Sequence, residues 1–482
     1  MSSSRVVRVH ARDEVAAQSL REGIAKIQSE LEVTPEFAPE VEAAATRAAA
    51  NPRLPELDRT DIPFVTVDPA SSMDLDQALH IEREGSGYVV HYAIADVAAF
   101  VEPGDPVDVA SLARGETLYG ADSKVPLHPT SLSEGAASLL PDQLRPALLW
   151  TIHVDDTGEG TDVHVERARV RSRAKLDYVG VQKAIEDGTG DETLMLLKEV
   201  GELRLQREAA RGGISLPLPE QEVEVVGDEW SLEFRSMIPA ETWNAQISML
   251  TGFAAASLMV YARVGLLRTL PPPRAHDLQR LHRVARALHI DWPAEQLYPD
   301  FIRNLDSRKP AEAAMITASA RLLRGSGYVS FDGEVPADPI HAALASEYAH
   351  VTAPLRRLGD RYAAEICVAL CAGTDVPSWV SAKLADIPEV MKDAGRRAAQ
   401  YEAMVLDLVE AGILHPHVGE TFEGVVTDID EKDATRGKIT IQEPAVEAPV
   451  TGPRALPLGT EAEVRLTQAD VPSRSVVFEL TQ

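Results

Sequence analysis

The sequence predicts an α+β fold in three parts: a small helical N-terminal domain, a central domain of mixed sheet and helix, and a C-terminal β-barrel. Apolar residues recur at helical spacing over residues 13–31, alternate as in strands around residues 64–101, and alternate again in short segments near the C-terminus. A chain of 482 residues corresponds to about three domains. We place these domains at residues 1–58, 59–412 and 413–482.

The composition is that of an ordinary globular chain with an acidic balance. The 75 Asp and Glu residues exceed the 47 Lys and Arg residues, for a net charge of −28, and 45% of the residues are hydrophobic. Because phosphate binding depends on cations, this balance argues against a nucleic-acid partner unless arginines are concentrated locally or a metal takes part.

Cysteine usage and hydropathy favour a cytoplasmic protein with no membrane partner. Cys367 and Cys371 have no nearby His or Cys to complete a zinc site, so we interpret them as small buried residues in a reducing compartment. The first 14 residues lack the apolar core of a signal peptide. The uncharged run at residues 247–262 is too short and too rich in Ser, Thr and Gly to span a bilayer, which predicts a buried helix.

The N-terminal region is predicted to hold two helices. The first covers residues 13–31. Thr34 and Pro35 then offer an N-cap and a first-turn proline for a second helix that runs to about Ala50. The pair could form a helix-turn-helix unit or a plain packing hairpin, and the sequence leaves both open. The proline-broken residues 51–61 follow as a linker.

Three carboxylates follow a short predicted strand at residues 64–67. Asp68 comes directly after the strand, a turn at residues 69–72 follows, and Asp74 and Asp76 lie two apart, so that extended backbone points both the same way. Like charges held this close favour a hard cation such as Mg²⁺, which takes carboxylate, water and phosphate oxygens. Such a site suits phosphodiester hydrolysis. A solvated Asp-rich turn is the alternative, whereas the EF-hand pattern is absent.

The residues after this cluster predict a hairpin and a polar loop. A buried strand at residues 88–101 follows a turn at residues 85–87 and leads to Asp96, which either helps to order the metal site or caps the strand end. Tyr119 is the one aromatic residue in the polar loop at residues 114–129. Such a ring either stacks on a nucleobase or anchors the core.

A basic segment comes next. At the period of a strand, five cations fall on one face. This row indicates a docked anionic polymer, although a solvated or carboxylate-paired edge strand explains it as well. The five residues are Arg167, Arg169, Arg171, Arg173 and Lys175.

Residues 177–213, 240–290 and 311–325 are predicted to be mainly helical. Arg356 and Arg357 then follow a Thr-Ala-Pro turn that starts another helix. Guanidinium groups and free backbone N–H groups at a helix N-terminus form a ready phosphate site. Because an Arg pair there opposes the helix dipole, its presence favours a functional role.

A long helix at residues 387–411, expected to end near Gly412, leads into the C-terminal region. Short alternating segments between residues 418 and 482 predict five strands. Five short strands in about 65 residues are typical of an OB-type barrel, a fold that often grips single-stranded nucleic acid.

In this order, the motifs resemble those of the RNase II/RNase R family of hydrolytic 3′→5′ exoribonucleases, from about residue 60 onward. Asp68, Asp74 and Asp76 match the family's D-x5-D-x-D cluster. The central region thus resembles an RNB-type catalytic domain and the barrel resembles an S1 domain. Further matching segments are residues 93–97 (AIADV), the Tyr119 loop, residues 174–178 (AKLDY), residues 348–360 (YAHVTAPLRRLGD), and the helix with Glu402 and Asp407.

The chain departs from the family pattern in two places. The fourth carboxylate of the cluster is replaced by Gln77, whose amide oxygen can bind a metal but brings no charge. The segment before residue 60 is also helical and too short for the family's usual cold-shock domains. We therefore expect a preference for single-stranded tails and a modest ability to open duplexes.

The resemblance implies roles for individual residues. Asp68, Asp74, Asp76 and Gln77 would hold one or two Mg²⁺ ions, with Mn²⁺ as the alternative. Asp74, Asp76 and Arg356 would carry catalysis on single-stranded RNA, with nucleoside 5′-monophosphates as products. Besides the five cations of the basic segment, the expected RNA-contacting residues are Tyr119, Tyr178, Tyr348, Thr352, Arg357 and Glu402.

Two other functions remain open at this stage, and no protein partner is expected. One is a non-catalytic RNA-binding or regulatory protein, in which Gln77 marks a decayed site. The other is an acidic protein that binds Ca²⁺ and has no affinity for RNA.

Overall fold

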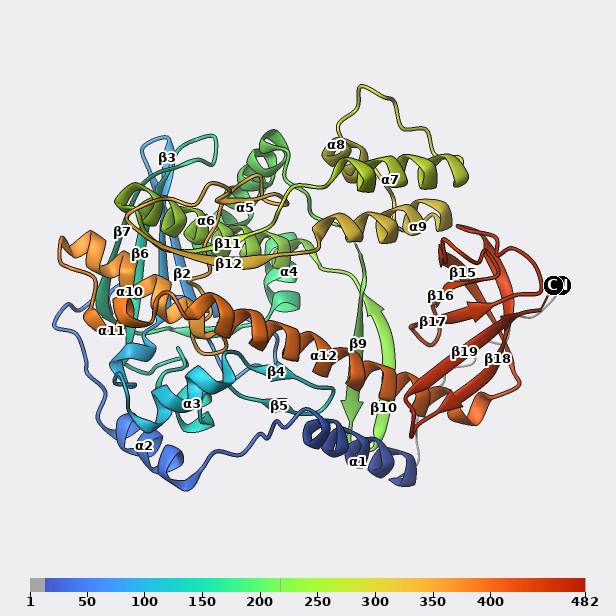
Figure 1. The fold of residues 1–482 in the computed structure, drawn as a ribbon. Coiled ribbons are helices and arrows are strands. Elements are labelled where there is room, and N and C mark those ends of the chain that lie inside the picture. The colour runs from blue at the N-terminus through green and yellow to red at the C-terminus, as the bar shows by residue number, and fades with distance from the viewer. Residues whose placement is uncertain (1–13, 217, 482) are drawn as a thin grey trace.

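The computed structural model describes residues 14–216 and 218–481, so the first 13 residues, where a signal peptide was sought, lie outside it. Its centre is a six-stranded mixed sheet in the order β7-β6-β3-β2-β1-β8 (Figure 1). All neighbours are antiparallel except β1 and β8. The strands are β1 (Val65–Val67), β2 (Gln77–Glu84), β3 (Gly87–Ala95), β6 (Arg145–Val154), β7 (Gly160–Val170) and β8 (Ala174–Leu176).

The predicted hairpin around Gly85 is confirmed as β2 and β3, with Gly85 at a positive φ of 60° in the turn. Side chains of β3 alternate between two apolar cores, because Tyr92 and Ile94 pack on one face and Ala93 and Ala95 on the other. Burial on both faces explains why this strand is apolar at nearly every position, with His91 as the exception.

Helices cover both faces of the sheet. On one face, α6 is the apolar helix expected around residues 247–262, and Ile247 and Leu250 are buried in the core. Length and composition alone would let α6 cross a membrane, but it packs against α5, α10 and β11 as a core helix. The helices of this face are α4 (Tyr178–Glu186), α5 (Glu192–Arg211), α6 (Pro239–Ala262), α10 (Leu358–Ala372) and α11 (Ser378–Lys383).

The two N-terminal helices join different cores. The first is confirmed as α1 (Glu14–Glu30), which packs on the long helix α12 (Ile387–Leu414). The second, α2 (Pro39–Ala50), packs on α3 (Pro106–Arg114) beneath the sheet. It begins at Pro39 and not at Pro35, because the Thr34 hydroxyl accepts a hydrogen bond from the Glu36 N–H in a local turn.

Helix α12 runs to Leu414, past the end predicted at Gly412. A Cβ at Gly412 would lie 2.6 Å from Leu20, and one at Gly23 would lie 2.7 Å from Leu408. Gly412 therefore permits close packing of α12 against α1 and does not end the helix.

Four antiparallel strand pairs and a small helical module complete the described part of the central region. The prediction of mainly helical structure over residues 240–290 is wrong for residues 264–269, which form strand β11. This strand pairs with β12, at residues 327–332. The strands are β4 (Leu118–Tyr119), β5 (Lys124–Val125), β9 (Glu220–Val226), β10 (Glu229–Arg235), β11 (Val264–Thr269), β12 (Gly327–Asp332), β13 (Ile340–His341) and β14 (Ser346–Glu347). The module has α7 (Ala275–Ala287), α8 (Tyr298–Arg303) and α9 (Pro310–Ser319) around its own apolar core.

The C-terminal prediction is confirmed by a closed five-stranded barrel in the order β15-β16-β17-β19-β18. Its interior shares one continuous apolar core with α1, α12 and β10, to which Leu20, Val405, Trp230 and Leu466 belong. The strands are β15 (Thr421–Ile429), β16 (Arg436–Ile441), β17 (Val446–Thr451), β18 (Glu461–Asp470) and β19 (Ser475–Leu480).

Candidate active site

The three predicted carboxylates lie on the connection between β1 and β2. The Ser72 N–H donates to the Pro69 carbonyl at 2.9 Å, which closes the turn expected there. Leu75 is fully buried between two of the acids, and its N–H donates to the Ser138 hydroxyl at 3.0 Å. Because Leu75 is held in this way, its neighbours Asp74 and Asp76 have little freedom to move apart.

The acids influence one another electrically. Asp76 is only 4% exposed, and burial raises its pKa to about 8 although Arg356 opposes the shift. Burial likewise raises the pKa of Asp68 to about 6. The charge of Asp74 contributes to both increases, so the three carboxylates lie within one electrostatic neighbourhood.

The donor chemistry of this cluster fits a hard divalent cation. Asp68 Oδ2 is buried and has no hydrogen-bond partner, and a cation would compensate both this orphaned oxygen and the raised pKa values. Among the residues that the structure describes, no group of three or more His, Cys, Asp or Glu side chains is arranged to hold a metal by itself. Such an ion would therefore need water or substrate phosphate oxygens as additional ligands.

Gln77, a predicted metal ligand, makes two hydrogen bonds within the protein. Its Nε2 donates to the Thr352 carbonyl at 2.7 Å, and its Oε1 accepts from the Tyr92 hydroxyl. The amide oxygen thus accepts one hydrogen bond from the protein, and Gln77 ties β2 to the segment that precedes Arg356.

Arg356 lies beside Asp76, the buried carboxylate of the cluster. Its Nε is 3.6 Å from Asp76 Oδ2, and 46% of its side chain is exposed, so the guanidinium can also reach a ligand. The Leu355 N–H donates to Asp76 Oδ1 at 2.8 Å, which fixes this turn against the acid cluster. The pairing brings together residues that are 279 positions apart in the sequence.

Three of the backbone N–H groups expected to be free at this helix start have partners within the protein. The N–H groups of Arg356 and Arg357 donate to the Ala353 carbonyl, and that of Leu358, the first residue of α10, donates to the Gly115 carbonyl. A phosphate at this position would therefore meet the Arg356 side chain and not these three N–H groups. Arg357 itself is engaged with Asp360 at 2.6 and 2.9 Å.

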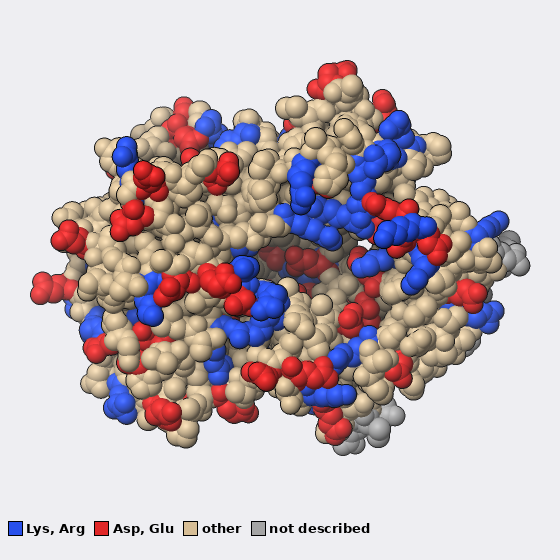
Figure 2. All heavy atoms as spheres, in the orientation of Figure 1, with Lys and Arg blue, Asp and Glu red and all other residues tan. Residues whose placement is uncertain are grey.

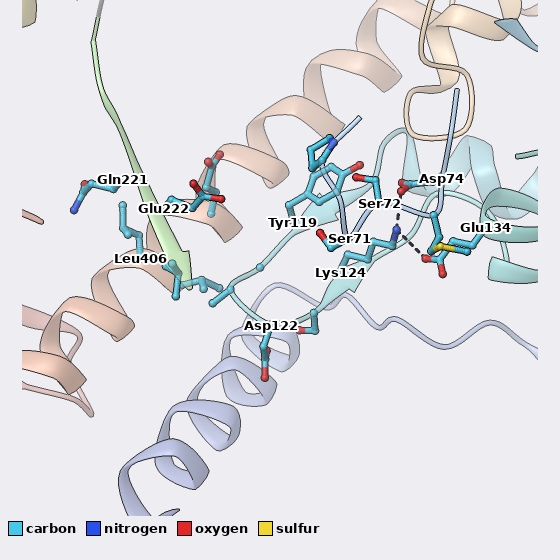
Figure 3. Close-up of a pocket in the computed structure, with 18 residues that line it drawn as sticks. Ser71, Ser72, Asp74, Tyr119, Asp122, Lys124, Glu134, Gln221, Glu222 and Leu406 are labelled. Carbon is cyan, nitrogen blue, oxygen red and sulfur yellow. Dashed lines mark ion pairs between the residues drawn. The ribbon is translucent and has the colours of Figure 1, made fainter. Parts of the chain in front are cut away.

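Tyr119 stands at the edge of a cavity of about 670 Å³ next to the acids (Figure 3). The residue is 47% exposed, while burial of its hydroxyl end and the charge of Asp74 raise its pKa. Figure 3 shows Tyr119 and Asp74 on one side of the cavity, with Glu222 of β9 on the other. Exposed Glu402 of α12 also lines it.

Lys124 is a site residue that sequence reasoning missed. Its Nζ lies 3.2 Å from Asp74 Oδ2 and 2.8 Å from Glu134 Oε1. Lys124 is the only lysine in the Tyr119 loop, and a cation so close to an acid cluster in sequence was the available signal. Glu134 and Glu222 carried no such signal.

The predicted row of five cations does not form. Strand β7 ends at Val170, and Lys175 lies on β8, at the opposite edge of the sheet, where its Nζ donates to the Ala70 carbonyl at 2.8 Å. Arg167 pairs with Asp96 at 2.8 Å and with Glu365, so Asp96 serves this arginine and not the metal site. Arg169 pairs with Asp58 at 3.3 Å and Arg173 with Asp191, while Arg171 is exposed.

The remaining predicted RNA-contacting residues fall into two groups. Tyr178 lies near enough to Asp68 that the charge of this acid, together with burial, raises the pKa of Tyr178 to about 12. Tyr348 is 8% exposed and packs edge-on against Phe253, and the Thr352 hydroxyl hydrogen bonds with that of Ser248 at 2.8 Å. Tyr348 and Thr352 thus support the site from within the protein.

The described chain combines two parts. One is a mixed sheet that carries an acid cluster with an arginine beside it, which is a candidate phosphodiesterase site, and the other is an OB-type barrel. The chain belongs to the RNB domain family. The family model for the RNB domain matches residues 57–372, and the model for the RNase II-type exonuclease C-terminal S1 domain matches residues 420–481.

Named relatives agree with this assignment. Ribonuclease R 1 of Lactococcus lactis is 25% identical over 450 residues, which cover 86% of this chain and 54% of that protein. The chain therefore spans about half the length of the curated relatives it matches.

Solved structures share the fold. Mycoplasma genitalium RNase R in complex with ribose-methylated single-stranded RNA superposes with a TM-score of 0.84 at 20% identity, over 96% of this chain and 78% of that one. Yeast Ssd1, described as a pseudonuclease, has a TM-score of 0.68 at 15% identity, over 94% of this chain and 57% of that one.

Proposed function

We propose that this protein is a hydrolytic 3′→5′ exoribonuclease that degrades single-stranded RNA to nucleoside 5′-monophosphates in the cytoplasm. The observation that carries the proposal is the junction of Asp76 with Leu355 and Arg356, which joins an acid cluster and a cation across the fold. Membership of the RNB family and the names of its relatives support the same activity.

In this proposal, Asp68, Asp74 and Asp76 hold one or two Mg²⁺ ions, with Mn²⁺ as the alternative. A bound divalent ion would supply charge neutralisation and a more acidic water at the scissile phosphate. The orphaned Asp68 oxygen and the raised pKa values of Asp68 and Asp76 support this assignment.

Arg356 donates to the phosphate oxygens as negative charge develops on them, an effect typically worth about 3 kcal/mol. Its exposed guanidinium is oriented from one side by Asp76, which leaves N–H donors for the substrate. Tyr119 stacks on the terminal base and fixes which phosphodiester lies beside the acids.

The other residues predicted to contact RNA divide into candidate RNA contacts and residues that support the protein structure. Tyr178 and Glu402 border the acids or the cavity and can face the strand, and exposed Arg171 remains a candidate for phosphate contacts. We assign the other predicted contacts to support of the protein structure, because each is held by protein partners. These residues are Arg167, Arg169, Arg173, Lys175, Tyr348, Thr352 and Arg357.

A catalytically weakened RNA-binding protein is the second candidate function. It is favoured by Gln77, whose amide is engaged with protein groups at the place of a family carboxylate. The fold of a pseudonuclease is also similar to that of this chain.

A labelled-RNA assay separates the two functions. The protein is incubated with 5′-labelled oligo(A) and Mg²⁺, with EDTA as the control. The proposal expects stepwise shortening from the 3′ end and release of nucleoside 5′-monophosphates, both stopped by EDTA. RNA binding without shortening would establish the second candidate instead.

A further inference from the structure

Helix α7 is amphipathic: one face packs in the core of the α7–α9 module, and part of its polar face is exposed. Leu281, Ala285 and Leu288 are buried in the core of the α7–α9 module. Arg283 and Arg286 lie three residues apart on the opposite, exposed face, together with His276 and Gln279.

Two arginines of this module are already used to hold the barrel. Arg280 lies 2.5 Å from Glu431 and 4.0 Å from Asp428, and Arg321 also pairs with Asp428. Arg280 and Arg283 are three residues apart on α7 and are therefore neighbours on its surface. The side of α7 that contacts the barrel thus borders the exposed face that carries Arg283 and Arg286.

Three arginines of the module behave differently, and we call Arg283, Arg286 and Arg324 the arginine rim. All three are exposed, and Arg324 follows Leu322, which packs in the module's core. Within residues 14–216 and 218–481, no carboxylate forms an ion pair with any of them. In a chain with 75 acidic and 47 basic residues, this leaves a local excess of positive charge.

Figure 2 shows how Lys and Arg, taken together, are distributed over this part of the surface. Lys and Arg gather over α7 and α9 along the upper border of a hollow, and Asp and Glu appear inside the hollow. In the matching view of Figure 1, the hollow lies over β9 and above α12, the two elements that also supply Glu222 and Glu402 to the cavity beside Tyr119.

We infer that the arginine rim binds backbone phosphates of single-stranded RNA outside the active site and guides the strand into the hollow. This inference rests on the proposed function. Positive charge at the mouth compensates for the acidic interior, because a polyanion approaching a chain of net charge −28 is otherwise repelled. Arginine suits this task because its planar fork binds phosphate oxygens in pairs.

The test compares the variant Arg283→Gln/Arg286→Gln/Arg324→Gln with the wild type. Binding is measured by fluorescence anisotropy without Mg²⁺, using oligo(A) of about 20 and about 5 nucleotides at several salt concentrations. Exposed Arg47→Gln on α2, at the far side of the molecule in Figure 1, is the matched control.

We expect the triple variant to bind the long RNA at least tenfold more weakly, with a salt slope reduced by about 2, since each single-strand phosphate contact contributes about 0.7. Binding and Mg²⁺-dependent hydrolysis of the short RNA should stay at the wild-type level, as should the thermal unfolding midpoint. Arg47→Gln should change none of these values.

Equal affinity and equal salt slope for long RNA in the variant and the wild type would overturn the inference. So would loss of binding to anionic lipid vesicles with RNA binding intact, which would assign the face to a membrane. Failure of the proposed function is distinguishable, because the wild type itself would then leave both RNAs at full length.

Discussion

The side-chain amide of Gln77 donates a hydrogen bond to the carbonyl oxygen of Thr352 at 2.7 Å. The preceding residue, Asp76, accepts a hydrogen bond from the Leu355 N–H at 2.8 Å. Two adjacent residues at the start of β2 therefore bind the segment that carries Arg356. This cross-link holds the acids and the arginine at one place, although they lie far apart in sequence.

Gln77→Asp should lower activity, although it restores the carboxylate of the family pattern. The substitution removes the donor to the Thr352 carbonyl and places a further negative charge near Asp76, at a cost of about 1–3 kcal/mol in unfolding free energy. Urea unfolding and kcat at a series of Mg²⁺ concentrations check this. The same change at exposed Gln18 of α1 is the control. A higher kcat at lower Mg²⁺ would instead show that residue 77 is a ligand position.

Asp76→Asn should abolish hydrolysis and leave RNA binding within a few-fold. Asn keeps an oxygen that accepts from the Leu355 N–H, so the fold of the turn is preserved while the charge is lost. Loss of several kcal/mol of transition-state stabilisation corresponds to about 10³-fold in kcat. Single-turnover hydrolysis and anisotropy on the same RNA measure the two quantities. A variant with full activity would reject the role of Asp76.

Arg356→Lys should reduce kcat by about 10²-fold with little change in KM, because Lys keeps the charge but loses the planar fork. Steady-state kinetics with oligo(A) separate the two parameters. Arg59→Lys is a matched control, since Arg59 is similarly exposed and lies 3.8 Å from Glu166. Unchanged turnover in the Arg356 variant would remove this residue from the catalytic set.

Tyr119→Ala should weaken binding of the RNA 3′ end by about 1–3 kcal/mol, the usual contribution of one stacked base. Tyr119→Phe keeps the ring and should retain most of the affinity. Kd values for oligo(A), together with the length of the final product, test this difference. If Phe were as harmful as Ala, the hydroxyl beside Asp74 would be the important group and not the ring.

Glu410 should make stability depend on pH. It is 4% exposed, and burial raises its pKa to about 7 from the ordinary 4.5, against the opposing hydrogen bonds from Gln221 and Glu447. The folded state therefore favours the protonated, neutral form of Glu410. The stability that this preference contributes is complete below pH 4.5 and is lost as the pH rises through about 7.

Between pH 5 and 8, the wild type should lose up to about 3 kcal/mol of unfolding free energy relative to Glu410→Gln. Urea unfolding at both pH values measures this difference. Glu423→Gln, at an exposed position on β15, should parallel the wild type. Parallel behaviour of Glu410→Gln and the wild type would show that Glu410 is charged when buried.

The sequence predicted the elements whose signals are local. The alternation of Val446, Ala448 and Val450 identifies a barrel strand without reference to its neighbours. The site depends on pairings that no local period encodes. Arg167 looks like a free cation in its strand, yet its carboxylate partner Glu365 lies 198 residues away. Gln77 and Thr352 are separated by 275 positions, so the role of Gln77 became visible only in the fold.

The apolar core that the barrel shares with α1, α12 and β10 has a consequence for engineering. A family model delimits the S1 segment by itself. Cutting the chain after α12 would nevertheless remove the barrel residues that pack on Leu20, Val405 and Trp230, and the exposed apolar surface would promote aggregation. The barrel is therefore not an independent unit that can be removed or exchanged by itself. Any chimera that imports a foreign barrel must redesign the surfaces of three other elements along with it.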